Sequence, residues 1–355
     1  MTSQSEDGAG NHPHMDDVLI AATLPSRSID LQPTDDCDGW TECLLSVHAQ
    51  RQIFDHPDFP QRLVKPSKTM YALRETRTAV QAVFALDDVQ TGELIMSERP
   101  LLVVPQAPIA LSKDRSLVRQ NQGDMKEWNK CLKAVVDRMD AQRRNAFYAL
   151  ANTRTKDNRA VNVLGIVATN GFDASELCEK DRPDAMGGYP VVGTDVSRLN
   201  HSCSPNATYS FQPDTFGMEL RAARRIRAGE EVTISYCPIF DTHEVRRQKL
   251  ALYGFDCTCA ACSNPIVSDG VRCRSEFQDP LQPGVASITT SLDLLKALEH
   301  EGLQGSSQYV NYLKCASEAY HRAGDAAKAE EYRVKVFKAA LGWTGRTRAF
   351  GVALF

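Results

Sequence analysis

The sequence lacks the long apolar run of a membrane-spanning helix, which needs about 18 or more such residues in succession. The first residues, MTSQSEDGAGNHPHMDD, lack both the basic and the apolar region of a secretory signal. These absences predict an intracellular protein of the cytoplasm, the nucleus or both, with no membrane partner.

An excess of positive charge is also missing: 41 Lys and Arg against 45 Asp and Glu give a net charge of −4. A function that needs a broadly positive surface, such as wrapping DNA, is therefore disfavoured.

The chain also lacks the signs of a disulfide framework. Its eleven cysteines are odd in number and follow no secretory signal, which favours reduced thiols or metal ligands. With 355 residues, 42% of them hydrophobic and 24% charged, the chain can bury a core without covalent cross-links.

The hydrophobic pattern divides the chain into regions. Residues 1–30 are polar and without period, so we expect them to be disordered. Residues 31–77 predict only a short helix near Glu42–Phe54. From Thr78, two short apolar runs separated by Asp-Asp and Thr-Gly turn signals predict a pair of strands. Residues 107–165 have apolar positions three and four apart and predict a helical insert.

Short strand-like segments return after the insert. GMELRAARRI and EVTISYC predict two strands joined by a turn at Gly229. A helix is predicted at Thr242–Leu252, with its basic residues on an exposed face. Residues 285–345 predict two or three amphipathic helices. We interpret them as a helical hairpin that caps the core, with a separate peptide-binding module like a tetratricopeptide unit as the alternative.

A cysteine cluster is the most specific local signal. CTCAAC places three thiols within six residues: Cys257, Cys259 and Cys262. Tetrahedral zinc needs four ligands, and a site closed by protein ligands is structural. The sequence offers three candidates for the fourth: Cys203, Cys237 and Cys273. The alternative is a chance group of unliganded cysteines.

Three further segments contain side chains that could carry chemistry: RLNHSCSPNATY at 198–209, GEEVTISYC at 229–237 and LYGFDCTC at 252–259. Taken alone, His201 favours a hydrogen-bonded structural histidine, and Tyr236 and Tyr253 favour core aromatics. Nucleophilic catalysis would need a base and an orienting group that the sequence cannot place.

In this order the segments resemble the SET-domain protein lysine methyltransferases with a cysteine-rich post-SET segment, most closely the SET-and-MYND branch and its fungal relatives. TGELIMSERPLL resembles the early SET strands, and TNGF is a further match. The resemblance implies an α+β fold: a mostly β SET domain at 78–240 with a pseudoknot formed by the NHSC segment, a helical insert, a zinc-binding post-SET segment at 241–273, and C-terminal helices at 285–345.

The resemblance also implies a function, a protein lysine N-methyltransferase that uses S-adenosylmethionine. Tyr236 and Tyr253 would be the catalytic tyrosines that line the lysine channel. The residues implied to bind the cofactor are Asn170, Asn200, His201, Tyr236 and Phe255. Those implied to bind structural zinc are Cys203, Cys257, Cys259 and Cys262. The implied partner is a protein substrate with a target lysine, histone or non-histone, and the C-terminal helices are a candidate surface for another protein.

Two features of the family are missing. The glycine-rich stretch before Val/Leu-Phe-Ala is replaced by TAVQA at 78–82, which adds Cβ atoms where close backbone approach is needed. The ligand cluster of a MYND module is absent from residues 1–70. An inactive SET-fold scaffold is therefore the alternative function, and cofactor binding distinguishes the two. A zinc-ribbon nucleic-acid module is disfavoured, because the second cysteine pair is missing at the right spacing.

Overall fold

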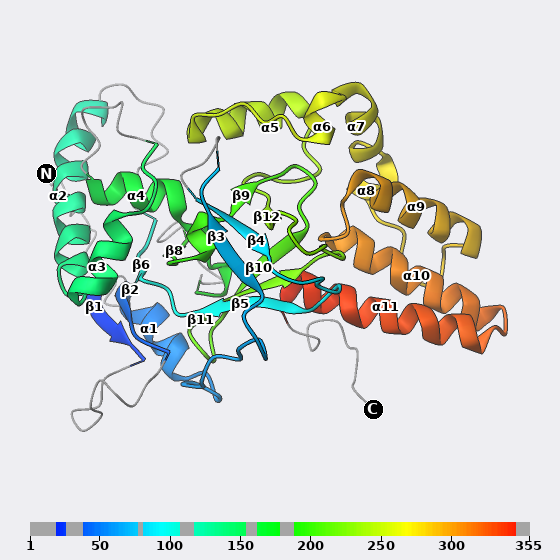
Figure 1. Ribbon diagram of the computed structural model, residues 1–355, viewed down its shortest axis with the longest axis horizontal. Coiled ribbons are helices and arrows are strands. Elements are labelled where there is room, and N and C mark those ends of the chain that lie inside the picture. Colours follow the sequence, from blue (N-terminus) through cyan, green and yellow to red (C-terminus); the bar gives the residue numbers. More distant parts are fainter. Residues whose placement is uncertain are drawn as a thin grey trace, which may run out of the picture.

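The computed structural model describes residues 19–25, 38–76, 81–106, 117–153, 162–177 and 188–345. Strands lie at the centre of the molecule, with one group of helices on one side and the C-terminal helices on the other (Figure 1). The architecture is the expected α+β type. In the part of the chain described, no helix combines the length and apolar character needed to cross a membrane.

The largest sheet has the strand order β1-β2-β6-β8-β7. Its strands are β1 (Leu19–Leu24), β2 (Thr41–Ser46), β6 (Leu102–Val103), β8 (Pro190–Val192) and β7 (Phe172–Asp173). β1 pairs antiparallel with β2 over its whole length, and every residue of β2 is buried. The expectation that residues 1–30 are disordered is therefore wrong for β1. The strand is held by hydrogen bonds to a distant buried strand, which its own short apolar pattern does not reveal.

The two apolar runs that follow Thr78 do form strands, but they do not pair with each other. The strands concerned are β3 (Tyr71–Arg74), β4 (Ala82–Ala85), β5 (Leu94–Glu98), β10 (Ala207–Gln212) and β11 (Gly217–Ala222). β4 pairs with β3, whereas β5 lies beside β11 in the sheet β10-β11-β5. The predicted pairing is wrong because the intervening segment closes no hairpin: Val89 bridges to Ile226 instead.

The two segments predicted as strands on either side of Gly229 contain strands, which pair with other parts of the chain. β11 ends at Ala222 and pairs with β10 and β5. β12 (Thr233–Ile234) pairs in parallel with β9 (Asn200–His201), a segment 33 residues earlier in the chain. Gly229 does make the expected turn, with a φ of +79°. The parallel pair brings two of the chemistry-bearing segments side by side.

The insert is helical in its described residues. It contains α2 (Leu117–Val136), α3 (Ala141–Tyr148) and α4 (Asn162–Asn170), so the last helix runs beyond the predicted end at residue 165. Residues 107–116 and 154–161 lie outside the described residues. Apolar side chains of the insert share one buried cluster with strands of the largest sheet.

Near the N-terminus, the helix predicted at Glu42–Phe54 begins later, as α1 (Val47–Phe54), because Ser46 caps it and the preceding residues form β2.

The helices after β12 are α5 (His243–Leu250), α6 (Ala260–Ser263), α7 (Pro265–Arg272), α8 (Ser275–Gln278), α9 (Ile288–Glu301), α10 (Ser307–Arg322) and α11 (Ala326–Thr344). Short 3₁₀ turns are η2 (Ser175–Leu177), η3 (Val196–Arg198) and η4 (Ala251–Tyr253). α9, α10 and α11 share a hydrophobic cluster of their own. α11 also packs on the central strands, and the Thr208 hydroxyl of β10 donates to the Gly342 carbonyl.

Candidate active site and metal centre

Four cysteine sulfurs converge beside β9. The sulfurs belong to Cys203, Cys257, Cys259 and Cys262, and they all lie within 4.8 Å of one another. The Sγ of Cys203 is 3.5 Å from that of Cys262 and 4.0 Å from that of Cys257. Of the three candidates for the fourth ligand, Cys203 therefore joins the cluster. Cys237 is buried next to it, and Cys273 is exposed on α7's C-terminal side.

The donor set fits zinc. Zinc bound by four thiolates at about 2.3 Å in a tetrahedron separates its sulfurs by about 3.8 Å, close to the two Sγ–Sγ distances of 3.5 and 4.0 Å. Hydrogen bonds from Cys203, and then from Cys257, lower the pKa of the Cys259 thiol, which favours the thiolate that a soft cation requires.

α5 contributes a buried cation to this region. The helix matches the one predicted at Thr242–Leu252, but the expectation that its basic residues are all exposed is wrong for Arg246, whose side chain is 0% exposed. Leu250, one turn later on the same face, packs with Cys203. The local sequence HEVRRQKL is too polar for a hydrophobic period to reveal which face is inward.

His201 links the cysteine cluster to Tyr236. Its Nδ1 accepts a hydrogen bond from the Tyr236 backbone N–H at 3.0 Å, and its Nε2 is 3.2 Å from the Cys203 Sγ. Burial lowers the pKa of His201 to about 4, so the imidazole is neutral at pH 7. The parallel pairing of β9 with β12 produces this contact by placing His201 beside Ile234.

Aromatic side chains continue from His201 toward the segment that contains Cys257, Cys259 and Cys262. The ring centroids of Tyr236 and Tyr253 are 4.8 Å apart, and that of Phe255 lies 6.1 Å from His201 and 6.4 Å from Tyr236. The Tyr236 hydroxyl donates to the Leu199 carbonyl. Burial raises the pKa of Tyr236, so its hydroxyl stays protonated at neutral pH.

Tyr236 and Tyr253 line a cavity of about 230 Å³ that Asn170 and Asp173 also line. Asn170 ends α4, and its amide donates to the carbonyls of Ala151 and Ile166. Burial raises the pKa of Asp173. The structure thus brings Asn170 to the same cavity as the two tyrosines. Its side-chain amide, however, donates to backbone carbonyls of the helical insert.

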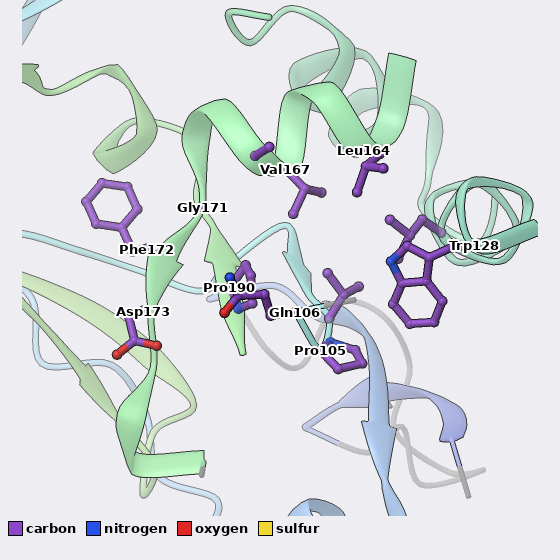
Figure 2. A pocket seen from close by; sticks show the side chains of 12 residues that line it. Pro105, Gln106, Trp128, Leu164, Val167, Gly171, Phe172, Asp173 and Pro190 are labelled. Atoms are coloured by element: carbon purple, nitrogen blue, oxygen red, sulfur yellow. The ribbon is translucent and has the colours of Figure 1, made fainter. Parts of the chain in front are cut away.

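A second cavity, of about 390 Å³, adjoins the first and shares Gly171, Phe172 and Asp173 with it. Figure 2 shows Leu164 and Val167 projecting from their helix into the space that Trp128 borders. Its lining is mostly apolar, in contrast to the tyrosine-lined cavity.

Two asparagines of the site have hydrogen-bond partners that the sequence did not reveal. Asn200, a predicted cofactor ligand, donates from Nδ2 to the Glu231 carboxylate at 2.7 Å. Asn206 is buried, donates to Glu230 Oε1 and to the Glu231 carbonyl, and accepts from the Thr233 N–H. Both lie within the quoted motifs, so their positions were visible but their partners were not. They hold the NHSC segment against the segment that leads to Tyr236.

Two observations fit an organic ligand near these residues. Phe255 exposes 38% of its surface although it is a large aromatic. The buried Oε1 of Gln81 has no hydrogen-bond partner among the described residues. Gln81 belongs to the glycine-free stretch at 78–82, whose residues 78–80 lie outside the described part of the chain.

Comparison with known proteins identifies the domain. The family model for the SET domain matches residues 81–237. Histone-lysine N-methyltransferase SET5 of Scheffersomyces stipitis is 34% identical over 140 residues, 37% of this chain and 28% of that protein. Histone-lysine N-methyltransferase SMYD1 of Homo sapiens is 31% identical over 156 residues, 40% of this chain and 31% of that protein. The chain spans less than a third of the length of these relatives.

A solved structure, the SET domain of LSMT bound to lysine and AdoHcy, is 12% identical and has a TM-score of 0.35, over 85% of this chain and 94% of that one. The family match covers the segment from β4 to Cys237, with the parallel β9–β12 pair inside it. Residues 81–237 therefore form a SET domain, similar in sequence to the SMYD and fungal SET5 proteins.

Proposed function

We propose that the protein is a protein lysine N-methyltransferase that uses S-adenosylmethionine. The observation that carries the proposal is the junction of His201, Tyr236 and Tyr253, which couples the NHSC segment to a tyrosine-lined cavity. Relatives named histone-lysine N-methyltransferases support a protein substrate, histone or non-histone, in the nucleus or cytoplasm.

When bound, S-adenosylmethionine supplies a methyl group on a positively charged sulfur. Asn200, His201 and Phe255 are the residues that would hold it, with Asn170 as a further contact. Exposed Phe255 offers a surface for stacking, and neutral His201 adds no positive charge against the sulfonium.

The tyrosine-lined cavity prepares the target lysine. The rings of Tyr236 and Tyr253 exclude water, and desolvation lowers the pKa of a lysine amine, which makes the neutral nucleophile available. Asp173 on the cavity wall attracts the ammonium form as it arrives. Tyr236, protonated and held by the Leu199 carbonyl, orients the amine and does not act as its base. The adjoining apolar cavity extends the site for residues that flank the lysine.

Structural zinc is the second part of the proposal. Cys203 comes from the NHSC segment, and Cys257, Cys259 and Cys262 come from the segment after Tyr253. Zinc at these sulfurs would tie the cofactor-binding segment to the wall of the lysine cavity. It would organise the site and take no part in methyl transfer, because all four ligand positions are filled by protein.

The test is transfer of a radiolabelled methyl group from S-adenosylmethionine to core histones and to an array of lysine peptides. We expect Tyr236→Phe to lower kcat about 100-fold or more while the cofactor Kd changes less than about three-fold, because the hydroxyl orients the reacting groups. Tyr148→Phe, an exposed tyrosine on α3, is the matched control and should retain full activity.

An inactive scaffold is the second candidate, favoured by the absence of glycine at 78–82. This candidate predicts that the folded, zinc-loaded protein binds neither S-adenosylmethionine nor S-adenosylhomocysteine. Equal methyl transfer by the wild type and Tyr236→Phe would contradict the role given to this tyrosine.

A further inference from the structure

Arg246 of α5 is fully buried, although arginine is rarely so unless its charge and donors are matched. Its Nη1 donates to the Asp241 carbonyl and lies 3.4 Å from Asp269 Oδ1. The Nε and Nη2 atoms have no well-aligned hydrogen-bond acceptor among the described residues. Two buried donor nitrogens of this guanidinium, Nε and Nη2, therefore lack an acceptor among the described residues.

The direction of the side chain identifies that acceptor. Arg246 and Leu250 are the buried residues of α5, one turn apart on one face. Leu250 packs in the small cluster that contains Cys203, Cys237 and Ala261. The face that carries Arg246 is thus turned toward the cysteine sulfurs.

The electrostatics agree with this placement. Cys203 and Cys262 lie close enough to the Arg246 guanidinium to interact with its charge. The ion pair with Asp269 is long at 3.4 Å, and the Asp269 carboxylate also accepts from the His243 N–H at 2.9 Å. Asp269 alone therefore leaves most of the guanidinium unmatched.

Zinc with four thiolates carries a net charge of −2, since one divalent cation meets four anions. Cys203 is fully buried, so this charge would sit partly away from water. Donors in the surroundings of a metal site orient its ligands and offset their charge. Arg246 supplies one positive charge and two donor nitrogens, Nε and Nη2, at this position.

We propose that Arg246 is a positioning residue of the zinc–thiolate centre, which donates from Nε and Nη2 to the sulfurs of Cys203 and Cys262. The inference rests on the proposed zinc site. The competing explanation is a purely structural ion pair, in which Arg246 only anchors α5 and α7 through Asp269.

The test compares zinc retention in the full-length wild type, Arg246→Met, Arg246→Lys and Asp269→Asn. Zinc content is measured by elemental analysis, and zinc affinity and release by competition with a chromogenic chelator. Circular dichroism checks the fold. Cobalt-substituted samples add a sulfur-to-cobalt charge-transfer spectrum, which responds to hydrogen bonds at sulfur and not to a remote ion pair.

We expect Arg246→Met to weaken zinc affinity about 10- to 100-fold and to shift the cobalt spectrum. Arg246→Lys, which keeps the charge but not the fork of donors, should recover part of the affinity. Asp269→Asn keeps an acceptor for His243 and should stay within about three-fold of the wild type. If Arg246→Met does not fold, the same spectral shift and a loss of about ten-fold in Arg246→Lys support the inference.

Two results would overturn it. Wild-type zinc affinity and an unchanged cobalt spectrum in the arginine variants would leave the zinc site intact and remove only the role of Arg246. Equal losses in Asp269→Asn and the arginine variants would favour the ion pair. A folded wild type that binds no zinc would refute the proposed zinc site and this inference together, so the two failures are distinguishable.

Discussion

Glu98, the last residue of β5, holds the turn that leads into the NHSC segment. Its carboxylate accepts from the backbone N–H groups of Thr194, Asp195 and Val196 at 2.8 to 3.2 Å. Burial raises the pKa of Glu98 to about 7; the N–H groups oppose this rise, and the charge of Asp195 adds to it. One carboxyl thus connects the central sheet to the chain that carries Asn200.

This pKa makes stability depend on pH. Unfolded Glu98 loses its proton near pH 4.5, whereas folded Glu98 keeps it up to about pH 7. As pH rises between these values the unfolded state binds fewer protons, so the free energy of unfolding falls. Relative to Glu98→Gln, we expect the wild type to lose about 1 to 2 kcal/mol from pH 5 to pH 7.5, less than the full shift because the side chain is only half-buried.

Urea unfolding at several pH values measures this difference. Gln keeps a carbonyl acceptor for the same N–H groups and has no titration, so it is the matched variant. Parallel curves for the wild type and Glu98→Gln over this pH range would contradict the assignment.

The residues of the site divide by what a sequence can reveal. The resemblance of the NHSC and CTCAAC motifs predicted that Cys203 would join Cys257, Cys259 and Cys262, and their sulfurs do converge. The functional roles of Asn170, Asn200, His201, Phe255 and the two tyrosines remain predictions. Arg246 and Glu98 were missed, because their meaning depends on partners far away in the chain and not on local pattern.

At the scale of elements, α11 approaches β11 closely through Gly342. A Cβ at this position would lie 2.7 Å from the Ala222 carbonyl oxygen. Gly342→Ala should therefore destabilise the protein by about 1 to 2 kcal/mol, because the clash exceeds the gain in helix propensity.

Gly270 in α7 is the control for this prediction, since a Cβ there meets nothing within 4 Å. Gly270→Ala should stabilise the protein by about 0.5 to 1 kcal/mol. Chemical denaturation of both variants measures the contrast. A gain of stability in both would show that α11 does not need the close approach at Gly342.

Element types were easier to predict than their partners. The strand near residue 82, the insert helices and the C-terminal helices follow from local apolar spacing. The pairing of β5 with β11 and of β1 with β2 does not, because each is decided by burial among distant segments. β1 is the clearest case, since its six residues show no distinct alternation of apolar and polar side chains that would predict a strand or its partner.

At the scale of the whole molecule, the cysteine cluster joins two segments more than fifty residues apart. Zinc removal should therefore lower the unfolding midpoint by about 5 to 10 °C and weaken cofactor binding, because Cys203 lies two residues after His201. Differential scanning fluorimetry before chelation, after it and after zinc return measures the effect. An unchanged midpoint after complete removal of bound zinc would refute a structural role.

Cofactor binding tests the central claim most directly. Calorimetric titration of S-adenosylmethionine and S-adenosylhomocysteine into zinc-loaded protein should give a micromolar Kd. Asn200→Ala should weaken binding at least about ten-fold, because Asn200 lies beside His201 on β9 and its side-chain amide is fixed by a hydrogen bond to Glu231. Folded, zinc-loaded wild type that binds neither molecule would contradict the methyltransferase account and leave a SET-fold scaffold.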